Sequence, residues 1–213
     1  MRADYLRIVA RVAAPLKAAA RAHPRLNVAL WNAQYRLGIW DYLDDARASG
    51  SEVLALVDKH SPHGRILDLG CGTSENLRLV PGTYAHYHGV DVSTEAIARA
   101  RRVGRPSATF EAADIVTYAT SERYDAILLR EVLYYLPREC VADLLVRLAS
   151  MLAPGGRIFV QLTGQPDLRV TVETAGLEVV DVVVEAARSR RHTTVFLVLE
   201  DLERHRRRYQ GAS

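Results

Sequence analysis

The chain has 213 residues, 49% of them hydrophobic and 25% charged, with a formal net charge of +3. These values suit one large globular domain and exclude a disordered or fibrous chain. No run reaches the roughly 20 apolar residues of a membrane span. Cys71 and Cys140 lie far apart, and a disulfide at Cys71 would distort a glycine loop, so we expect a reducing, cytoplasmic setting.

The N-terminal segment is predicted to form a basic amphipathic helix over residues 3–22. Its apolar residues recur at spacings of four, three and four and are Tyr5, Val9, Val12 and Leu16. We expect this stripe to pack on the parent domain. Contact with a second copy in a homodimer, or with an anionic membrane surface, is the alternative.

Two further helices are predicted before the first strand. One begins after Pro24 and leads into an aromatic cluster that includes Tyr35 and Trp40, and the other occupies residues 51–60. The cluster suits a lid that closes over a cofactor, which makes Tyr35 and Trp40 candidate cofactor-binding residues. A helical cap packed on the sheet edge is the alternative. Residues 1–60 are therefore predicted to be an N-terminal helical extension.

From residue 61 onward, short apolar or β-branched runs alternate with segments predicted to be helical. The runs are residues 66–69, 87–92, 108–111, 125–129 and 157–162. Such alternation indicates a parallel sheet covered on both faces. No convincing helix separates the last two runs, 177–185 and 193–200, so they are predicted to form an antiparallel hairpin.

The predicted fold is therefore a doubly wound, Rossmann-like α/β domain over residues 61–200. Its seven-stranded sheet is mostly parallel and ends in the antiparallel C-terminal hairpin. Residues 201–213 follow as a basic tail that contains Arg204 and Arg206.

The first predicted strand ends in a glycine-rich turn, Asp68-Leu-Gly-Cys-Gly-Thr-Ser74. Glycine lacks a Cβ, so a cofactor can approach the backbone closely. In a dinucleotide-binding turn the third glycine would fall at Glu75, whose side chain obstructs the helix and whose carboxylate repels a pyrophosphate. The turn therefore disfavours NAD.

Carboxylates stand at or just after the ends of the first three strands, at Asp68, Asp91 and Asp114. Asp91 follows Gly70 by 21 residues, where an acidic side chain can accept hydrogen bonds from ribose hydroxyls. Parallel strands bring these carboxylates to one edge of the sheet. An acidic rim suits a cofactor with a sulfonium and an ammonium and no phosphate, which predicts S-adenosylmethionine (SAM).

Four segments resemble successive motifs of the class I SAM-dependent methyltransferases: residues 66–73, 89–93, 113–115 and 151–156. The resemblance implies that Asp68 and the backbone of Gly70, Cys71 and Gly72 hold the methionine portion of SAM. It further implies that Asp91 binds the ribose, that Asp114 binds the adenine amino group, and that Val92 and Ile115 pack against the adenine ring. Ser74 stands where the family usually has glycine.

The fourth predicted strand leads into Glu131-Val-Leu-Tyr134-Tyr135-Leu, at the edge that borders the transferred methyl group in this fold. This segment is similar to the nodulation-factor N-methyltransferases and related bacterial enzymes that act on sugars and natural products. Glu131, Tyr134 and Tyr135 are candidate catalytic residues that orient the acceptor or accept its proton. His192 is a fourth candidate, and Arg130 is a candidate for cofactor binding.

The leading hypothesis is a metal-independent methyltransferase that acts on an N or O atom of a small hydrophilic acceptor by in-line displacement. An RNA or protein methyltransferase recruited by the basic ends, and a non-catalytic SAM-binding scaffold subunit, are the alternatives. The residues 129–132, Leu-Arg-Glu-Val, lack the Asn- or Asp-Pro-Pro-aromatic sequence of adenine-N6 methyltransferases. Nucleic acid is therefore disfavoured as a partner.

Overall fold

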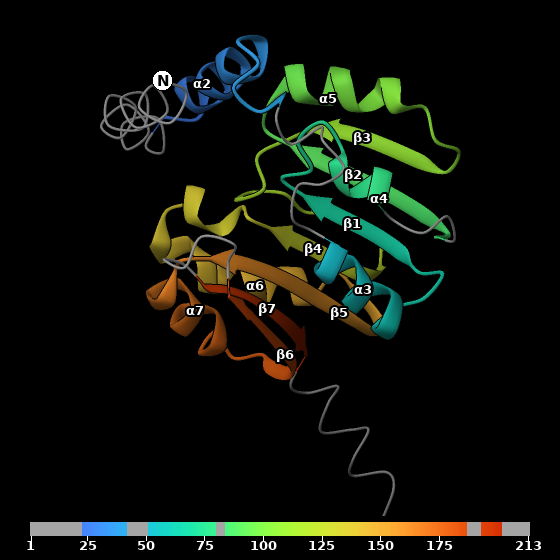
Figure 1. The fold of residues 1–213 in the computed structure, drawn as a ribbon, viewed down its shortest axis with the longest axis vertical. Helices are drawn as coiled ribbons and strands as arrows, with labels where there is room; N and C mark the ends of the chain where they lie inside the picture. Colours follow the sequence, from blue (N-terminus) through green and yellow to red (C-terminus); the bar gives the residue numbers. More distant parts are fainter. Residues whose placement is uncertain (1–22, 42–50, 80–83, 187–192, 202–213) are drawn as a thin grey trace, which may run out of the picture.

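The computed structural model describes residues 23–41, 51–79, 84–186 and 193–201. Its centre is a seven-stranded sheet with the order β3-β2-β1-β4-β5-β7-β6 (Figure 1). The strands are β1 (Arg65–Leu69), β2 (His86–Asp91), β3 (Ala108–Ala112), β4 (Tyr124–Arg130), β5 (Leu152–Thr163), β6 (Glu178–Ala186) and β7 (Thr193–Glu200).

Strands β1 to β5 pair in parallel, and β7 pairs antiparallel with both β5 and β6. The predicted mostly parallel sheet with a C-terminal hairpin is thus confirmed. Because β7 lies between β5 and β6, the edge strand β6 runs in the same direction as the first five strands.

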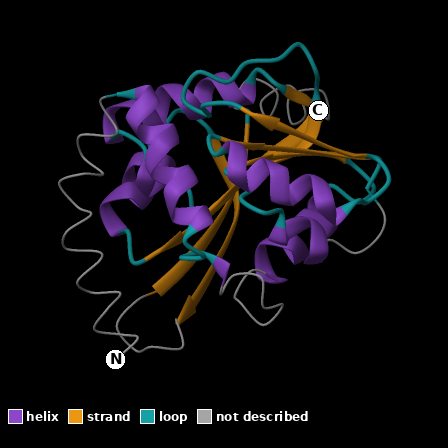
Figure 2. Cartoon of the chain, turned by 90° about the horizontal axis from the view of Figure 1, so that it is seen from above, coloured by secondary structure: helices purple, strands orange, loops and turns teal. Residues whose placement is uncertain are grey.

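Helices cover both faces of the sheet, as Figure 2 shows. They are α2 (Pro24–Arg36), α3 (Ser51–His60), α4 (Glu75–Leu79), α5 (Thr94–Ala100), α6 (Val141–Ala149) and α7 (Pro166–Glu173), with short 3-10 turns η2 (Arg101–Val103), η3 (Leu133–Tyr135) and η4 (Arg138–Cys140). None of the helices in the described part of the chain is long and apolar enough to cross a membrane.

Alternate residues of the strands pack into two apolar cores, one on each face of the sheet, because successive side chains of a strand point to opposite faces. Ile127 of β4 packs in one core with α6 and α7, whereas its neighbour Leu128 packs in the other with α3 and α4. Both side chains are fully buried. This two-sided burial explains why the central strands are nearly continuous apolar runs in the sequence.

The connection between β3 and β4 contradicts the prediction that a helix separates each pair of strands. Residues 113–123 form turns and bends instead. The Arg147 side chain of α6 donates hydrogen bonds to the backbone oxygens of Ile115, Val116 and Tyr118. Because the Arg147 side chain supplies the hydrogen-bond donors for these carbonyl oxygens, they do not need the hydrogen bonds of a helix.

Strand β5 begins at Leu152, five residues earlier than the sequence predicted. The register with β4 is interrupted, since Tyr124 pairs with Leu152 and Ala126 pairs with Arg157. A Cβ at Gly156 would lie 2.6 Å from the Tyr124 backbone oxygen, so this close approach requires glycine. The predicted helix at residues 3–22, His192 and the tail from residue 202 onward lie outside the described residues.

Candidate functional site

The turn between β1 and α4 is held against the end of β2 by backbone hydrogen bonds. The amides of Gly70 and Cys71 donate to the Val90 oxygen at 2.7 and 3.1 Å. Gly70 and Gly72 have φ angles of 76° and 55°, in the left-handed region that favours glycine. A Cβ at Gly72 would lie 2.9 Å from the Tyr35 hydroxyl oxygen. The turn therefore needs glycine for both its backbone conformation and its packing.

Ser74, where the family pattern has glycine, also has a positive φ of 67°. It is fully buried, and its Oγ has no hydrogen-bond partner among the described residues. A non-glycine residue in this conformation carries local strain. The left-handed backbone explains why glycine suits this position.

Asp91, at the end of β2, accepts hydrogen bonds from two backbone amides. Its Oδ2 accepts from Gly72 N at 3.0 Å, and its Oδ1 accepts from Ser93 N at 2.8 Å. Burial, together with the nearby charges of Glu75 and Asp68, raises the pKa of Asp91 to about 6 although the two backbone hydrogen bonds lower it. The carboxylate therefore links the glycine turn to the start of α5 and gains from a cation or a hydrogen-bond donor nearby.

Asp68, at the end of β1, is buried behind the turn. It accepts hydrogen bonds from Asn76 Nδ2 at 2.8 Å and from the Tyr87 hydroxyl. Burial raises its pKa to about 6. Asn76 Oδ1 in turn accepts from Arg130 Nη1 at 2.7 Å. The Asp68–Asn76–Arg130 chain fixes the Arg130 guanidinium at the carboxyl end of β4.

One cavity of about 790 Å³ lies at this edge of the sheet. Its wall contains most of the site residues predicted from the sequence: Tyr35, Trp40, Gly70, Gly72, Asp91, Val92, Asp114, Ile115, Arg130, Glu131, Tyr134 and Tyr135. Asp68 and Cys71 are buried and are not part of the wall. The predicted roles of these residues in binding and catalysis stay predictions, although their convergence on one cavity supports them.

Glu131 directly follows β4 and lines the same cavity. Its φ is 54°, a strained conformation for glutamate. Its Oε1 accepts hydrogen bonds from Thr163 Oγ1 at 2.6 Å and from Gln161 Nε2 at 3.1 Å, both from β5. Burial, followed by the charges of Tyr135 and Glu131, raises the pKa of Tyr134 far above its usual range. Tyr134 therefore stays protonated at neutral pH and can donate a hydrogen bond.

Four aromatic side chains from three segments line the same cavity: Trp31, Trp40, Tyr134 and Tyr135. We call them the aromatic wall. Trp31 and Trp40 stack with ring centroids 5.7 Å apart, and Trp31 meets Tyr135 edge to face at 4.9 Å. Tyr134 and Tyr135 are 4.5 Å apart. Such contacts fix ring orientation and present apolar surface to a ligand.

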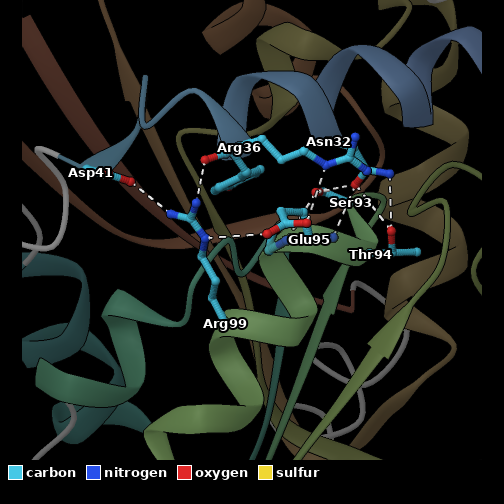
Figure 3. Close-up of polar contacts among 9 residues, drawn as sticks. Asn32, Arg36, Asp41, Ser93, Thr94, Glu95 and Arg99 are labelled. Carbon is cyan, nitrogen blue, oxygen red and sulfur yellow. Dashed lines mark hydrogen bonds and ion pairs between the residues drawn. The ribbon is translucent and has the colours of Figure 1, made fainter.

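Helix α2, which carries Trp31 and Tyr35, is fastened to α5 by the polar contacts drawn in Figure 3. Asn32 Oδ1 accepts hydrogen bonds from Ser93 Oγ at 2.7 Å and from Glu95 N at 3.1 Å. Arg99 donates to the Tyr35 backbone oxygen at 2.6 Å and pairs with Asp41 at 2.9 Å. Trp31 and Trp40 of the aromatic wall are thereby positioned by residues that lie well after them in the sequence.

The cavity wall also contains residues that the sequence did not predict as site residues: Asn27, Trp31, Glu75, Asn76, Val132, Leu136, Thr163 and Gln165. Helical spacing could have found two of them, because Asn27, Trp31 and Tyr35 follow one another every four residues on one face of α2. Thr163 and Gln165 carried no such signal, since only the pairing of β5 with β4 brings them to the cavity.

Among the described residues, no group of three or more His, Cys, Asp or Glu is arranged to hold a metal ion. The acidic residues of the cavity wall are Glu75, Asp91, Asp114 and Glu131. The one cationic side chain in the wall formed by the described residues is Arg130.

Comparison with known proteins gives a family match over most of the chain. The family model described as a methyltransferase domain matches residues 40–210. The trans-aconitate 2-methyltransferase of Methylobacterium nodulans is 34% identical over 140 residues, which cover 63% of this chain and 53% of the relative. The chain thus spans about half the length of such curated relatives.

Two further proteins are similar to the chain. The dTDP-3-amino-3,6-dideoxy-alpha-D-glucopyranose N,N-dimethyltransferase of Streptomyces fradiae is 28% identical over 120 residues, which cover 55% of this chain and 47% of that protein. The N-methyltransferase NodS from Bradyrhizobium japonicum, solved with S-adenosylhomocysteine, has a TM-score of 0.62 and 21% identity, covering 76% of this chain and 98% of NodS. The NodS structure shows that the fold is shared.

Proposed function

The chain belongs to the methyltransferase-domain family, and we propose that it uses SAM to methylate an N or O atom of a small-molecule acceptor. One observation carries this proposal. A single cavity is lined both by the glycine turn with Asp91 and by Glu131 with the aromatic wall. Its volume of about 790 Å³ lies in the upper range of small-molecule sites, so a cofactor and a small acceptor have room side by side.

The charges of the site fit SAM better than a phosphate-bearing nucleotide. Asp68 Oδ1 is buried and has no hydrogen-bond partner among the described residues. Asp68 and Asp91 both have raised pKa values because burial disfavours their ionised forms. A cationic ligand offsets that cost, whereas a pyrophosphate would add negative charge to it. Arg130 supplies the one positive group in the described wall, which suits the carboxylate of a methionine moiety.

The residues have separate parts in the proposed reaction. Bound SAM would supply a methyl group on a positively charged sulfur, which keeps the electron pair as the acceptor atom bonds to the methyl carbon. The glycine turn and Asp91 hold the nucleoside, and the aromatic wall excludes water from the acceptor. An attacking hydroxyl or ammonium must also lose one proton. We assign this proton to Glu131, which lines the cavity with the aromatic wall and can accept the proton or pass it to water.

Calorimetry with S-adenosylhomocysteine (SAH) and with NAD tests the cofactor assignment. We expect one molecule of SAH to bind and NAD not to bind. Asp91→Asn should weaken SAH binding by about tenfold, since a charged hydrogen-bond partner of the ribose is lost. Glu122→Gln is the matched control, because Glu122 is exposed, lies next to the start of β4 and is not part of the cavity wall. Binding of NAD but not SAH would overturn the proposal.

A further inference from the structure

The aromatic wall offers an acceptor a broad surface of ring faces and edges. Its two tryptophans stack at an interplanar angle of 28°, and Tyr135 stands at 88° to both of them. Flat apolar groups and organic cations both bind to such surfaces, the cations through the negative ring face. A strongly hydrated sugar alone would leave much of this apolar surface without a complementary partner.

A carboxylate stands next to the aromatic wall. Glu131 directly precedes the segment that carries Tyr134 and Tyr135, and it lines the same cavity. The side chains that donate to its Oε1, Thr163 and Gln161, are neutral. They fix the position of the carboxylate and bring no positive charge to it. A partly buried carboxylate of this kind is well balanced by a cationic group on the ligand.

The other charged side chains of the cavity wall also disfavour an anionic acceptor. Arg130, the one cation of the described wall, is held by Asn76 on the side of the glycine turn. A polycarboxylate acceptor would meet the Glu131 carboxylate and the aromatic ring faces, with Arg130 as the one cationic side chain of the described wall. Like charges in a partly desolvated site repel, so such an acceptor is disfavoured. An alcohol is tolerated but makes no use of the Glu131 charge.

We infer that the acceptor is an amine on a flat apolar framework, with its nitrogen held by Glu131 and its framework on the aromatic wall. This inference rests on the proposed function and assigns its acceptor class. The ammonium gives one proton to the Glu131 carboxylate, and the freed nitrogen lone pair forms the bond to the methyl carbon. The carbon–sulfur bond breaks with its electron pair on sulfur. Glu131 then returns its proton to water.

Three probes of the same shape and different charge test the acceptor class: 2-phenylethylamine, 2-phenylethanol and phenylacetate. Their binding to the SAH-saturated protein is measured by calorimetry and ligand-observed NMR. We expect the amine to bind about tenfold more tightly than phenylacetate, with the alcohol between them. Only the amine can form an ion pair with Glu131 and a cation–ring contact with the aromatic wall. Trp31→Ala should weaken all three because it removes a shared apolar surface.

Glu131→Gln separates the charge from the shape of the site. It should lower the affinity for 2-phenylethylamine about tenfold and leave that for 2-phenylethanol within about twofold, since only the amine uses the charge. Glu139→Gln, an exposed carboxylate in η4, is the matched control and should change neither. Thermal unfolding and SAH binding of each variant show that the fold and cofactor site are intact.

The inference is overturned if phenylacetate binds as tightly as the amine, if Glu131→Gln affects all three probes alike, or if none binds at millimolar concentration. These outcomes differ from a failure of the proposed function, which would appear earlier as an absence of SAH binding to the unaltered protein. SAH binding without an amine preference therefore contradicts the acceptor class alone.

Discussion

Asn32 Oδ1 accepts a hydrogen bond from Ser93 Oγ at 2.7 Å, and Ser93 Oγ in turn accepts from Ala96 N at 3.1 Å. Ser93 is the N-cap of α5 and also donates its backbone N–H to Asp91. One short chain of hydrogen bonds therefore runs from helix α2 to the carboxylate in the cavity wall. The aromatic wall and the glycine turn are positioned by the same few residues.

Asn32→Ala should loosen α2 and weaken SAH binding. The substitution leaves the Ser93 hydroxyl and the Glu95 amide without their acceptor, which typically costs about 1–2 kcal/mol. Because Tyr35 lies on the same helix and lines the cavity, we expect a lower melting temperature and a several-fold loss of SAH affinity. Calorimetry and thermal unfolding measure the two effects.

Arg36→Ala is the control for that substitution, since Arg36 lies on the same helix and pairs with Glu95 at 3.5 Å on the surface. Exposed ion pairs contribute less than about 1 kcal/mol, so this variant should resemble the unaltered protein. Equal losses in both variants would contradict a specific role for Asn32.

Gly72→Ala should impair both stability and SAH binding. Gly72 has a φ of 55°, and a Cβ there would lie 2.9 Å from the Tyr35 hydroxyl oxygen. We expect about 1–2 kcal/mol of destabilisation from the left-handed backbone, together with a displaced Tyr35 side chain. Chemical unfolding and calorimetry measure these quantities.

Gly104→Ala isolates the backbone cost, because Gly104 has a similar φ of 62° and its Cβ would meet only the Arg102 oxygen at 3.7 Å. This variant should lose about 1 kcal/mol of stability and keep its SAH affinity. If Gly72→Ala also kept full affinity, the close packing of Tyr35 on the turn would have no part in binding.

Much of the fold could be predicted because its signals are local. Central strands such as β1 and β4 are buried on both faces and are therefore mostly apolar, and Gly70 and Gly72 mark the turn where the backbone conformation demands glycine. The turns at residues 113–123 could not be predicted, since their hydrogen-bond donor is Arg147, which lies far along the chain. Similarly, Thr163 joins the site only through the pairing of β5 with β4.

SAH binding should strengthen as the pH rises from 5.0 to 7.5. Burial raises the pKa of Asp91 to about 6, above the ordinary value of 3.8, so the carboxyl is mostly protonated at pH 5.0. The ionised form accepts hydrogen bonds from ribose hydroxyls more strongly, and we expect about fivefold tighter binding at pH 7.5. Calorimetry at both pH values measures the change, and tighter binding at pH 5.0 would contradict it.

The same raised pKa gives the stability of the ligand-free protein the opposite dependence on pH from that of SAH binding. The folded state binds more protons at Asp91 than the unfolded state between about pH 4 and 6, so the contribution of Asp91 to the free energy of unfolding falls as pH rises through that window. Because SAH is expected to bind more tightly at pH 7.5, the increase in melting temperature that it causes should be larger at pH 7.5 than at pH 5.0. A larger increase at pH 5.0 would rule out this linkage.

A crystal structure of the protein with SAH tests the central claim most directly, that one cavity brings a sulfur nucleoside and an acceptor together. We predict the nucleoside beside Asp91 and Asp114, and the sulfur directed toward Glu131 and the aromatic wall. SAH bound outside this cavity, or with its sulfur turned away from Glu131, would contradict the account.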